Sequence, residues 1–398
     1  MAAASVARAG SLAHAAVGEP ELGATYAFTA RLNIDQGQRA CSGSLVESQW
    51  ILTAASCFAD SPSRPVTVPA GKPKLATTAT IGRQDASTST GQVRDVVELV
   101  PRADQDLVLA KLSKPVTGVT PVTITASQPI GGERLAIAGY GRTRDQWVPN
   151  KLHTGSLDVS AVTGSALDLS GQTPVDGSVC KGDAGGPSLR KNGGRLELVG
   201  IHSTSNEAGC IGSEGAVSHA REARVDDVRS WIATHVARWS IKANANNKYV
   251  AGEFNESGSQ KGKLRARSDA PAGSWEQFTL HSNGTDGSLS LRSLNENLYV
   301  GVEVNESGSH QGMLRARGTS AGGWERLRLE KQSDGMYAIK SLQNGKYVSA
   351  EVNDAGTNNG LLRARTESPG GWERFAFERV DNFQIVDPQD AQPTPASG

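Results

Sequence analysis

The octapeptide Cys180-Lys-Gly-Asp-Ala-Gly-Gly-Pro187 holds three glycines, a proline and a cysteine within eight residues. It lies in a region, residues 16–223, in which short apolar segments alternate with Gly, Pro and Ser/Thr turns. Glycine makes up 45 of the 398 residues without a triplet period, which indicates many turns rather than collagen. We therefore predict an all-β region. One helix is expected after it, over 224–236, where apolar residues recur at helical spacing.

Three further segments accompany this loop. Cys41-Ser-Gly-Ser-Leu-Val-Glu-Ser-Gln-Trp-Ile-Leu-Thr-Ala-Ala-Ser-Cys57 and Asp106-Leu-Val-Leu-Ala-Lys-Leu112 precede it, and Leu198-Val-Gly-Ile-His-Ser203 follows it. In chain order, the four segments resemble the histidine, aspartate, nucleophile and substrate-binding segments of trypsin-like serine proteases. The resemblance covers about residues 16–237 and implies a double β-barrel with one C-terminal helix.

The sequence departs from this family at two of the three catalytic positions. The family writes Thr-Ala-Ala-His-Cys and Gly-Asp-Ser-Gly-Gly; here Ser56 stands at the histidine position and Ala184 at the serine position. Only Asp106 remains of the triad. Histidine accepts a proton near neutral pH and serine does not, and alanine offers no nucleophilic oxygen. Such losses cost on the order of 10⁶ in kcat in a comparable enzyme, so we predict a proteolytically inactive domain.

The backbone of the nucleophile loop is expected to persist. By resemblance, Gly182, Asp183 and Ala184 supply amide donors of an oxyanion hole. The resemblance also implies that the Asp183 side chain pairs with a new α-amino group after processing, at the segment 16–19.

Pocket residues follow from the same resemblance. Ser178 lies six residues before Ala184, where an aspartate in the family selects basic side chains, so Ser178 implies a neutral or apolar preference. His202 and Ser203 lie on the strand that should line this pocket. We expect His202 to be a polar wall residue rather than a substitute catalytic base.

The chain has four cysteines, Cys41, Cys57, Cys180 and Cys210. An even number without a CxxC pair fits two disulfides better than a zinc site. The family resemblance implies the pairs Cys41–Cys57 and Cys180–Cys210. Each disulfide would close a short loop and stabilise the folded state by about 3 kcal/mol. Disulfides indicate an oxidising compartment, and we expect a secreted protein.

The N-terminus and the charge set further limits. Residues 1–15 contain one arginine and end in Ala-His-Ala, which resembles a cleavage site; we expect a truncated signal or pro-segment. No run of 18 apolar residues is present, so no membrane span is expected. The 41 basic residues equal the 41 acidic ones, which argues against nucleic-acid binding. We expect no cofactor and no metal.

A repeat organises the C-terminal third. Residues 255–267 recur at 305–317 and, with changes, at 353–365. Each copy follows a Tyr-Val pair and precedes a Trp-Glu pair, which begin at Tyr249, Tyr299, Tyr347 and at Trp275, Trp324, Trp372. Within each unit, apolar and charged residues alternate as in half-buried strands. Propellers typically need four blades, so three units of this size favour a β-trefoil.

The repeat pattern, Lys-Tyr-Val, then Glu, Leu-x-Ala and Gly-Gly-Trp-Glu, resembles fascin-like trefoils over residues 239–380. Residues 381–398 are Pro-rich and are expected to form a flexible tail. Since each lobe repeats its tryptophan, we expect these rings in the core rather than as sugar platforms.

Six arginines, two in each repeat, offer a threefold array for an anionic glycan: Arg265, Arg267, Arg315, Arg317, Arg363 and Arg365. Residues 239–380 hold 18 Lys+Arg and 16 Asp+Glu, a net charge of 18 − 16 = +2. This excess is too small for an electrostatic trap, so we expect the arginines to pair with Glu276, Glu325 and Glu373.

These observations predict a secreted, catalytically inactive trypsin-like pseudoprotease that acts as a binding protein. The expected ligand is a peptide, a protein or a carbohydrate, the last bound by the trefoil. Two alternatives remain open: an active serine endopeptidase with an atypical triad, and a structural surface protein in which neither domain binds a ligand.

Overall fold

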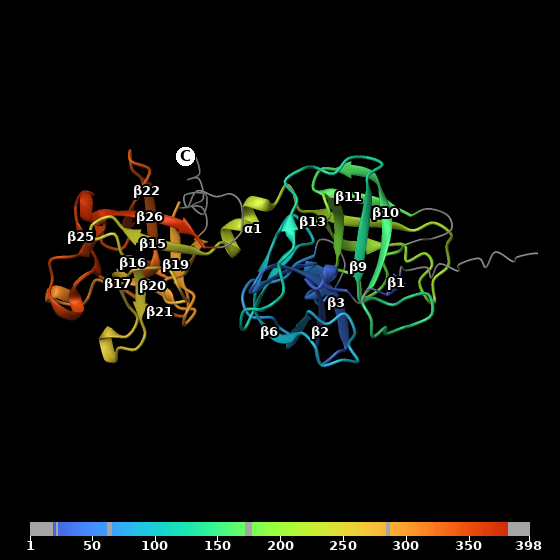
Figure 1. Cartoon of the computed structure of the whole chain (residues 1–398), viewed down its shortest axis with the longest axis horizontal. Helices are drawn as coiled ribbons and strands as arrows, with labels where there is room; N and C mark the ends of the chain where they lie inside the picture. Colours follow the sequence, from blue (N-terminus) through green and yellow to red (C-terminus); the bar gives the residue numbers. More distant parts are fainter. Residues whose placement is uncertain (1–18, 21–22, 62–65, 172–176, 284–286, 381–398) are drawn as a thin grey trace, which may run out of the picture. The chain divides into compact units, whose positions relative to one another are not determined.

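The computed structural model describes residues 19–20, 23–61, 66–171, 177–283 and 287–380 (Figure 1). The chain divides into two compact units, Met1–Arg229 and Ser230–Gly398. The expected leader, residues 1–15, and the expected tail, residues 381–398, lie outside the described residues.

The first half of the N-terminal unit is a closed six-stranded barrel. Its strands, in barrel order, are β2 (Thr29–Ile34), β3 (Arg39–Glu47), β4 (Trp50–Thr53), β7 (Val108–Leu112), β6 (Gln92–Pro101) and β5 (Thr77–Ile81). Alternate residues of β2, Ala30, Leu32 and Ile34, are fully buried, as the period of two requires of a strand with one face in a core.

A second six-stranded barrel follows, and it carries the nucleophile-like loop. Its order is β9 (Arg134–Gly139), β10 (His153–Thr163), β11 (Ala166–Ser170), β14 (His219–Arg224), β13 (Arg195–Ser205) and β12 (Pro187–Asn192). β12 pairs back with β9, which closes the ring. Two short strands, β1 (Glu19–Pro20) and β8 (Thr123–Ile124), add to β10 and β13. The predicted double barrel is therefore confirmed.

The helix is shorter than its apolar spacing predicted. α1 spans Arg229–Val236, whereas 224–236 was expected. Arg224 is instead the last residue of β14, paired with Gly200, and its guanidinium binds Asp226. Sheet pairing and this ion pair occupy the residues that periodicity alone assigned to a first helical turn.

The described residues of the C-terminal unit form twelve strands, four in each repeat. The first repeat holds β15 (Trp239–Ala243), β16 (Tyr249–Glu253), β17 (Lys263–Ser268) and β18 (Phe278–Ser282). The second holds β19 (Leu289–Ser293), β20 (Tyr299–Glu303), β21 (Met313–Gly318) and β22 (Leu327–Lys331). The third holds β23 (Tyr337–Ser341), β24 (Tyr347–Glu351), β25 (Leu361–Thr366) and β26 (Arg374–Arg379).

The pairing of these strands is that of a β-trefoil, as predicted. β15, β18, β19, β22, β23 and β26 pair in a closed ring, because β26 returns to β15. The hairpins β16–β17, β20–β21 and β24–β25 form a cap in which β17, β21 and β25 pair with one another.

The three repeated tryptophans do not lie in the core, which corrects the sequence-based expectation. Trp275, Trp324 and Trp372 are half-buried. The core position in each repeat is taken three residues later, by Phe278, Leu327 and Phe375, which are at most 1% exposed. The barrel wall is thus filled by the first residue of the following strand or by its neighbour, and the tryptophan remains at the surface.

Glycines hold the trefoil cap together at three equivalent points. The carbonyls of Gly262, Gly312 and Gly360 accept hydrogen bonds from the amides of Ala316, Ala364 and Ala266. A Cβ on Gly312 would lie 2.5 Å from the Ala364 carbonyl oxygen, and Gly312 has a φ of +75°. Gly308, earlier in the same repeat, has a φ of +60° but open space around it.

This contrast predicts different costs for two similar substitutions. Gly308→Ala should lower the free energy of unfolding by about 1–2 kcal/mol, the cost of a left-handed alanine. Gly312→Ala adds an overpacking cost of about 1–3 kcal/mol, because the clashing atom belongs to a hydrogen-bonded backbone. Thermal unfolding of the two variants measures the difference, and equal losses of stability would contradict the close approach at Gly312.

Candidate functional site

The carboxylate of Asp106 anchors the site between the two barrels. Asp106 lies just before β7 and is 6% exposed. Its Oδ1 accepts a hydrogen bond from the Ser56 amide at 2.7 Å, and its Oδ2 accepts one from the Ser56 hydroxyl at 3.0 Å. The Ser203 hydroxyl, from β13, also donates to Oδ2. Ser56, Asp106 and Ser203 therefore come together, and both hydroxyls contact the Asp106 carboxylate.

The loop that carries Ala184 lies against the Cys41–Cys57 segment. The Ala184 carbonyl accepts a hydrogen bond from the Ser42 amide at 2.9 Å, and the Cys57 Sγ lies 3.6 Å from the same oxygen. The Ser42 hydroxyl donates to the Gly182 carbonyl at 3.1 Å. Ala184 thus lies beside the segment containing Ser56, and its methyl group has no atom that can attack a carbonyl.

Two amides of this loop remain available. Among the described residues, the N–H groups of Gly182 and Ala184 donate to no protein acceptor. The Asp183 amide, expected as a third donor, instead donates to the Cys180 carbonyl at 2.9 Å. The tight turn of the loop uses this amide internally, so the expected oxyanion-hole donors reduce to Gly182 and Ala184.

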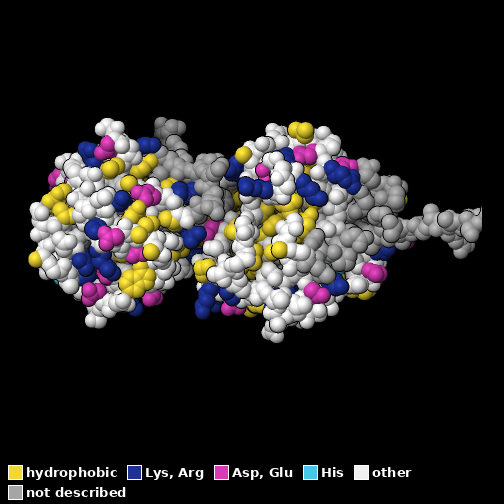
Figure 2. Space-filling view, in the orientation of Figure 1, with side chains coloured by type: hydrophobic (Ala, Val, Ile, Leu, Met, Phe, Trp, Pro, Cys, Tyr) yellow, Lys and Arg dark blue, Asp and Glu magenta, His cyan; other side chains and the backbone are white. Residues whose placement is uncertain are grey.

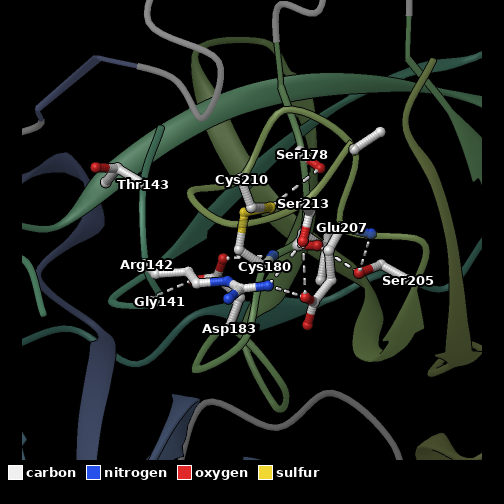
Figure 3. The surroundings of a disulfide bond; sticks show 12 residues. Gly141, Arg142, Thr143, Ser178, Cys180, Asp183, Ser205, Glu207, Cys210 and Ser213 are labelled. Carbon is white, nitrogen blue, oxygen red and sulfur yellow. Dashed lines mark hydrogen bonds and ion pairs between the residues drawn. A yellow bond between two sulfur atoms is a disulfide. The ribbon is translucent and has the colours of Figure 1, made fainter. Parts of the chain in front are cut away.

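The side chain of Asp183 holds the loop in place through hydrogen bonds to two backbone amides. Its carboxylate accepts hydrogen bonds from the Gly141 amide at 2.7 Å and from the Cys180 amide at 2.9 Å (Figure 3). Burial is the largest influence on this group and raises the pKa of Asp183 to about 6, although the two amides oppose the shift. The α-amino partner expected from residues 16–19 falls mainly on residues outside the described ranges.

The expected pocket is closed by hydroxyl groups. Ser178 is buried, and its Oγ lies 3.0 Å from the Ser218 Oγ. The Ser205 hydroxyl donates to the Val179 carbonyl, so it bridges β13 and the loop that holds Ser178 (Figure 3). The hydrogen bond ties these two segments together at the expected pocket. Sequence reasoning missed Ser205, although its position two residues after Ser203 on one strand was a usable signal.

His202 lies in the wall of the pocket, and its ring contacts a buried glutamate. Its ring is 1% exposed, and its Nδ1 lies 2.5 Å from the Glu222 Oε1. The Ser188 hydroxyl donates to the same oxygen at 2.8 Å. His202, Ser178 and Asp183 line a cavity of about 10 Å³, which matches the space of one water molecule. The Nδ1 of the ring is thus engaged by the buried carboxylate of Glu222.

An ion pair joins the loops at the rim of the pocket. Arg142 Nη2 donates to the Glu207 carboxylate and, at 2.9 Å, to the Ser213 hydroxyl (Figure 3). The Arg142 amide donates to the Lys181 carbonyl at 3.0 Å. Glu207 has a φ of +55°, a conformation that costs a non-glycine residue energy and is maintained by surrounding contacts.

Both predicted disulfides, Cys41–Cys57 and Cys180–Cys210, are present. They fix the two loops that flank Ala184. In the part of the chain that the structure describes, no group of three or more His, Cys, Asp or Glu side chains is arranged to hold a metal. No helix in the described ranges has the length and apolar character needed to cross a bilayer.

The arginines of the trefoil do not pair as expected. Arg265, Arg315 and Arg363 donate to carbonyls of a neighbouring hairpin loop, those of Asn359, Lys261 and Gln311. Arg267, Arg317 and Arg365 bind the buried carboxylates of Glu253, Glu303 and Glu351. Glu276, Glu325 and Glu373, the expected partners, accept hydrogen bonds from the amides of Gly273, Gly322 and Gly370. Those glutamates cap their own short turns, which leaves them turned toward the backbone.

Comparison with known proteins covers the N-terminal unit. A sequence model of the trypsin family matches residues 17–232. Serine protease SP24D of Anopheles gambiae is 30% identical over 219 residues, which cover 50% of this chain and 73% of that protein. Trypsin-1 of Salmo salar is 27% identical over 228 residues, covering 54% of this chain and 88% of that protein. Trypsin I-P1 of Gallus gallus is 28% identical over 219 residues, with coverages of 51% and 82%.

Proposed function

This chain belongs to the trypsin family, and from that premise we propose that its trypsin-like domain, residues 16–237, is a catalytically inactive binding protein. One observation carries the proposal. The Asp106 carboxylate accepts hydrogen bonds from the Ser56 amide and hydroxyl. At the loop position expected for the nucleophilic serine, the chain has Ala184, whose side chain is a methyl group. A triad needs a base of moderate pKa between a carboxylate and a nucleophile, and here both the base and the nucleophile are replaced.

An active endopeptidase with a rearranged triad is less well supported. Such an enzyme would need a histidine from another part of the chain close to Asp106, and the ring of His202 is instead paired with Glu222 at 2.5 Å. The hydroxyls of Ser56 and Ser203 do contact Asp106. A carboxylate at neutral pH is too weak a base to deprotonate them, so neither becomes an effective nucleophile.

A peptide or protein is the ligand that the cleft supports best. The amides of Gly182 and Ala184 are free to donate to a carbonyl, and the loop is fixed by a disulfide and by the Asp183 carboxylate. A preorganised pair of donors binds a carbonyl with little ordering cost. Because Ser205 closes the side-chain slot, a small residue such as glycine or alanine is favoured beside that carbonyl.

The two disulfides support secretion, since such bonds persist in oxidising compartments. For the second domain, residues 239–380, we propose a fascin-like trefoil that binds carbohydrate or protein. The alternative of a purely structural surface protein predicts that neither domain has a ligand.

The inactivity is tested with the purified chain. We expect no labelling by a fluorophosphonate probe and no cleavage of casein, because probe labelling requires an activated serine oxygen. A trypsin sample at equal concentration serves as the positive control. Labelling that maps to this chain, or casein cleavage that survives removal of host proteases, would show that an unrecognised nucleophile is at work.

A further inference from the structure

The outer arginine of each trefoil repeat is held in place with part of its guanidinium unused. Arg267, Arg317 and Arg365 are 41%, 45% and 39% exposed. Arg267 and Arg317 donate their Nε to Glu253 and Glu303, Arg365 forms an ion pair with Glu351, and these carboxylates are at most 8% exposed. Among the described residues, both Nη groups of Arg267 and Arg365 and the Nη1 of Arg317 have no protein acceptor. Each arginine therefore presents oriented N–H donors to solvent.

In two repeats this guanidinium lies over a tryptophan. The Arg317 guanidinium carbon is 5.3 Å from the Trp324 ring centre, and that of Arg365 is 6.0 Å from the Trp372 ring centre. Both rings are half-buried. Stacking and the buried carboxylate together restrict the side chain, so little entropy remains to be lost when a ligand binds.

The first repeat differs. Trp275 meets the edge of Phe254, with ring centres 6.4 Å apart at 85°. Val304 and Val352 occupy the position of Phe254 in the other repeats. In this repeat Trp275 thus has the Phe254 ring as its aromatic neighbour. Among the described residues, an Arg–Trp pair of this kind is present only in the second and third repeats.

We propose that the Arg317–Trp324 and Arg365–Trp372 pairs are two equivalent binding sites for a neutral, hydroxyl-rich saccharide. The inference rests on the proposed function of the trefoil and names the ligand class and the residues that recognise it. The guanidinium N–H groups donate to sugar hydroxyls. The exposed part of the indole packs against the apolar face of the sugar ring.

Charge decides between a neutral and an acidic saccharide. Around Arg317, the acidic groups Glu303, Glu325 and Glu306 all raise the pKa of its guanidinium, Glu303 most strongly through a hydrogen bond. In the third repeat, Glu351 interacts electrostatically with Arg365 and Arg363 and also with Asp354 and Glu373. The second site thus surrounds Arg317 with three carboxylates, and the third combines two arginines with three carboxylates. An anion would meet a slightly negative surrounding, whereas a hydroxyl needs only the N–H donors.

The surface of the trefoil agrees with this choice. On the face that Figure 2 shows, dark blue and magenta side chains are interspersed over the trefoil unit rather than gathered into one basic patch. Two sites on one rigid barrel also suit a polymer, because binding at the first site raises the effective concentration at the second.

The test uses the full chain and affinity electrophoresis through gels that contain a polysaccharide. The neutral polymers are hydroxyethylcellulose, galactomannan and xylan, and the acidic ones are polygalacturonate and heparin, each at 50 and 300 mM NaCl. We expect retardation by at least one neutral polymer, unchanged between the two salt concentrations, because no ion pair forms.

Variants locate the site. Trp324→Ala or Trp372→Ala should weaken the retention about tenfold, and the double variant more than either. Trp275→Ala and Trp147→Ala, the latter an exposed tryptophan of the other unit, should retain wild-type affinity. Should the alanine variants unfold, saturation of the Trp275→Ala protein with the neutral polymer should still shift its tryptophan emission.

The outcomes separate the two proposals. Salt-sensitive retention by the acidic polymers alone would overturn the neutral class, and retention that survives the double variant would overturn the location; carbohydrate binding by the chain would stand in both cases. Migration that no polymer retards would overturn both the sites and the carbohydrate function of the trefoil. None of these results touches the inactivity of the trypsin-like domain, which probe labelling tests.

Discussion

A chain carrying both Ser56→His and Ala184→Ser should react with a small fluorophosphonate probe, whereas either replacement alone should not. Nucleophile and base act as a unit, so supplying one without the other gains almost nothing. The expected gain is large because an intact triad and a truncated one differ by on the order of 10⁶ in kcat.

The surroundings that the double variant needs are already present. The Asp106 carboxylate, which now binds the Ser56 hydroxyl at 3.0 Å, would accept the imidazole N–H and set its tautomer. The new serine would lie in a loop fixed by the disulfide Cys180–Cys210. The backbone amides at positions 182 and 184 would stabilise the developing oxyanion.

A third substitution provides the matched control. Adding Asp106→Asn to the double variant keeps the size of the side chain but favours the wrong imidazole tautomer, which costs about 10⁴ in kcat in the analogous case. Labelling should therefore disappear again. A folded double variant that stays unlabelled would mean that the loop amides do not form a working oxyanion hole, and the peptide-binding proposal would lose its main support.

The fold was predictable because short sequence segments, the cysteine-containing motifs and the C-terminal repeat, indicate which distant parts of the chain pair with each other. Cys41, Cys57, Cys180 and Cys210 lie in segments whose order matches one family, and the structure pairs them as that family implies. The threefold barrel was likewise legible, since the repeat carries strand alternation and turn glycines in each copy. Gly258, Gly308 and Gly356, for example, all adopt positive φ.

The errors concern side chains whose neighbours come from elsewhere in the chain. The repeats showed that every lobe has a tryptophan equivalent to Trp324. They did not show that the core position three residues later would be filled, in that lobe by Leu327. Likewise Arg317 lay closer in sequence to Glu325, yet it binds Glu303 on the adjacent strand. Cross-strand register decides such partners, and one sequence does not reveal register.

The sequence predicted the motif residues of the site but not the contacts between its loops. Ser56, Asp106 and Ala184 follow from motifs. The hydrogen bond from Ser205 to the Val179 carbonyl and the use of the Asp183 amide within its own turn depend on how two loops meet. They change which donors remain and how wide the pocket is, so they alter the expected ligand more than the motifs do.

A fragment of residues 239–380 should fold by itself, and a fragment that stops at residue 335 should not. The last strand, β26, pairs with the first, β15, over five consecutive residue pairs from Trp239–Arg379 to Ala243–Phe375. Stopping at residue 335 removes β23 to β26. The barrel then loses its closure, and β15 and β22 become open edges.

The loss also reaches the core and the cap. The missing repeat contributes buried apolar residues to the single cluster that all three repeats share, among them Ile339, Val348, Ala350, Leu362 and Phe375. β25, which pairs with both β17 and β21, disappears with it. The remaining two repeats cannot bury their inward faces, so no cooperative transition is expected.

Circular dichroism and calorimetry distinguish the two fragments. Residues 239–380 should give a β-type spectrum and one calorimetric transition, because about 142 residues suffice for one hydrophobic core. A fragment of residues 230–380, which includes all of α1 except its first residue, is the matched control for the domain boundary, since the second compact unit begins at Ser230. Folding of 230–380 but not of 239–380 would assign the helix to the trefoil. A cooperative transition in the fragment ending at 335 would show that two repeats suffice, and the closed-barrel account of its stability would be wrong.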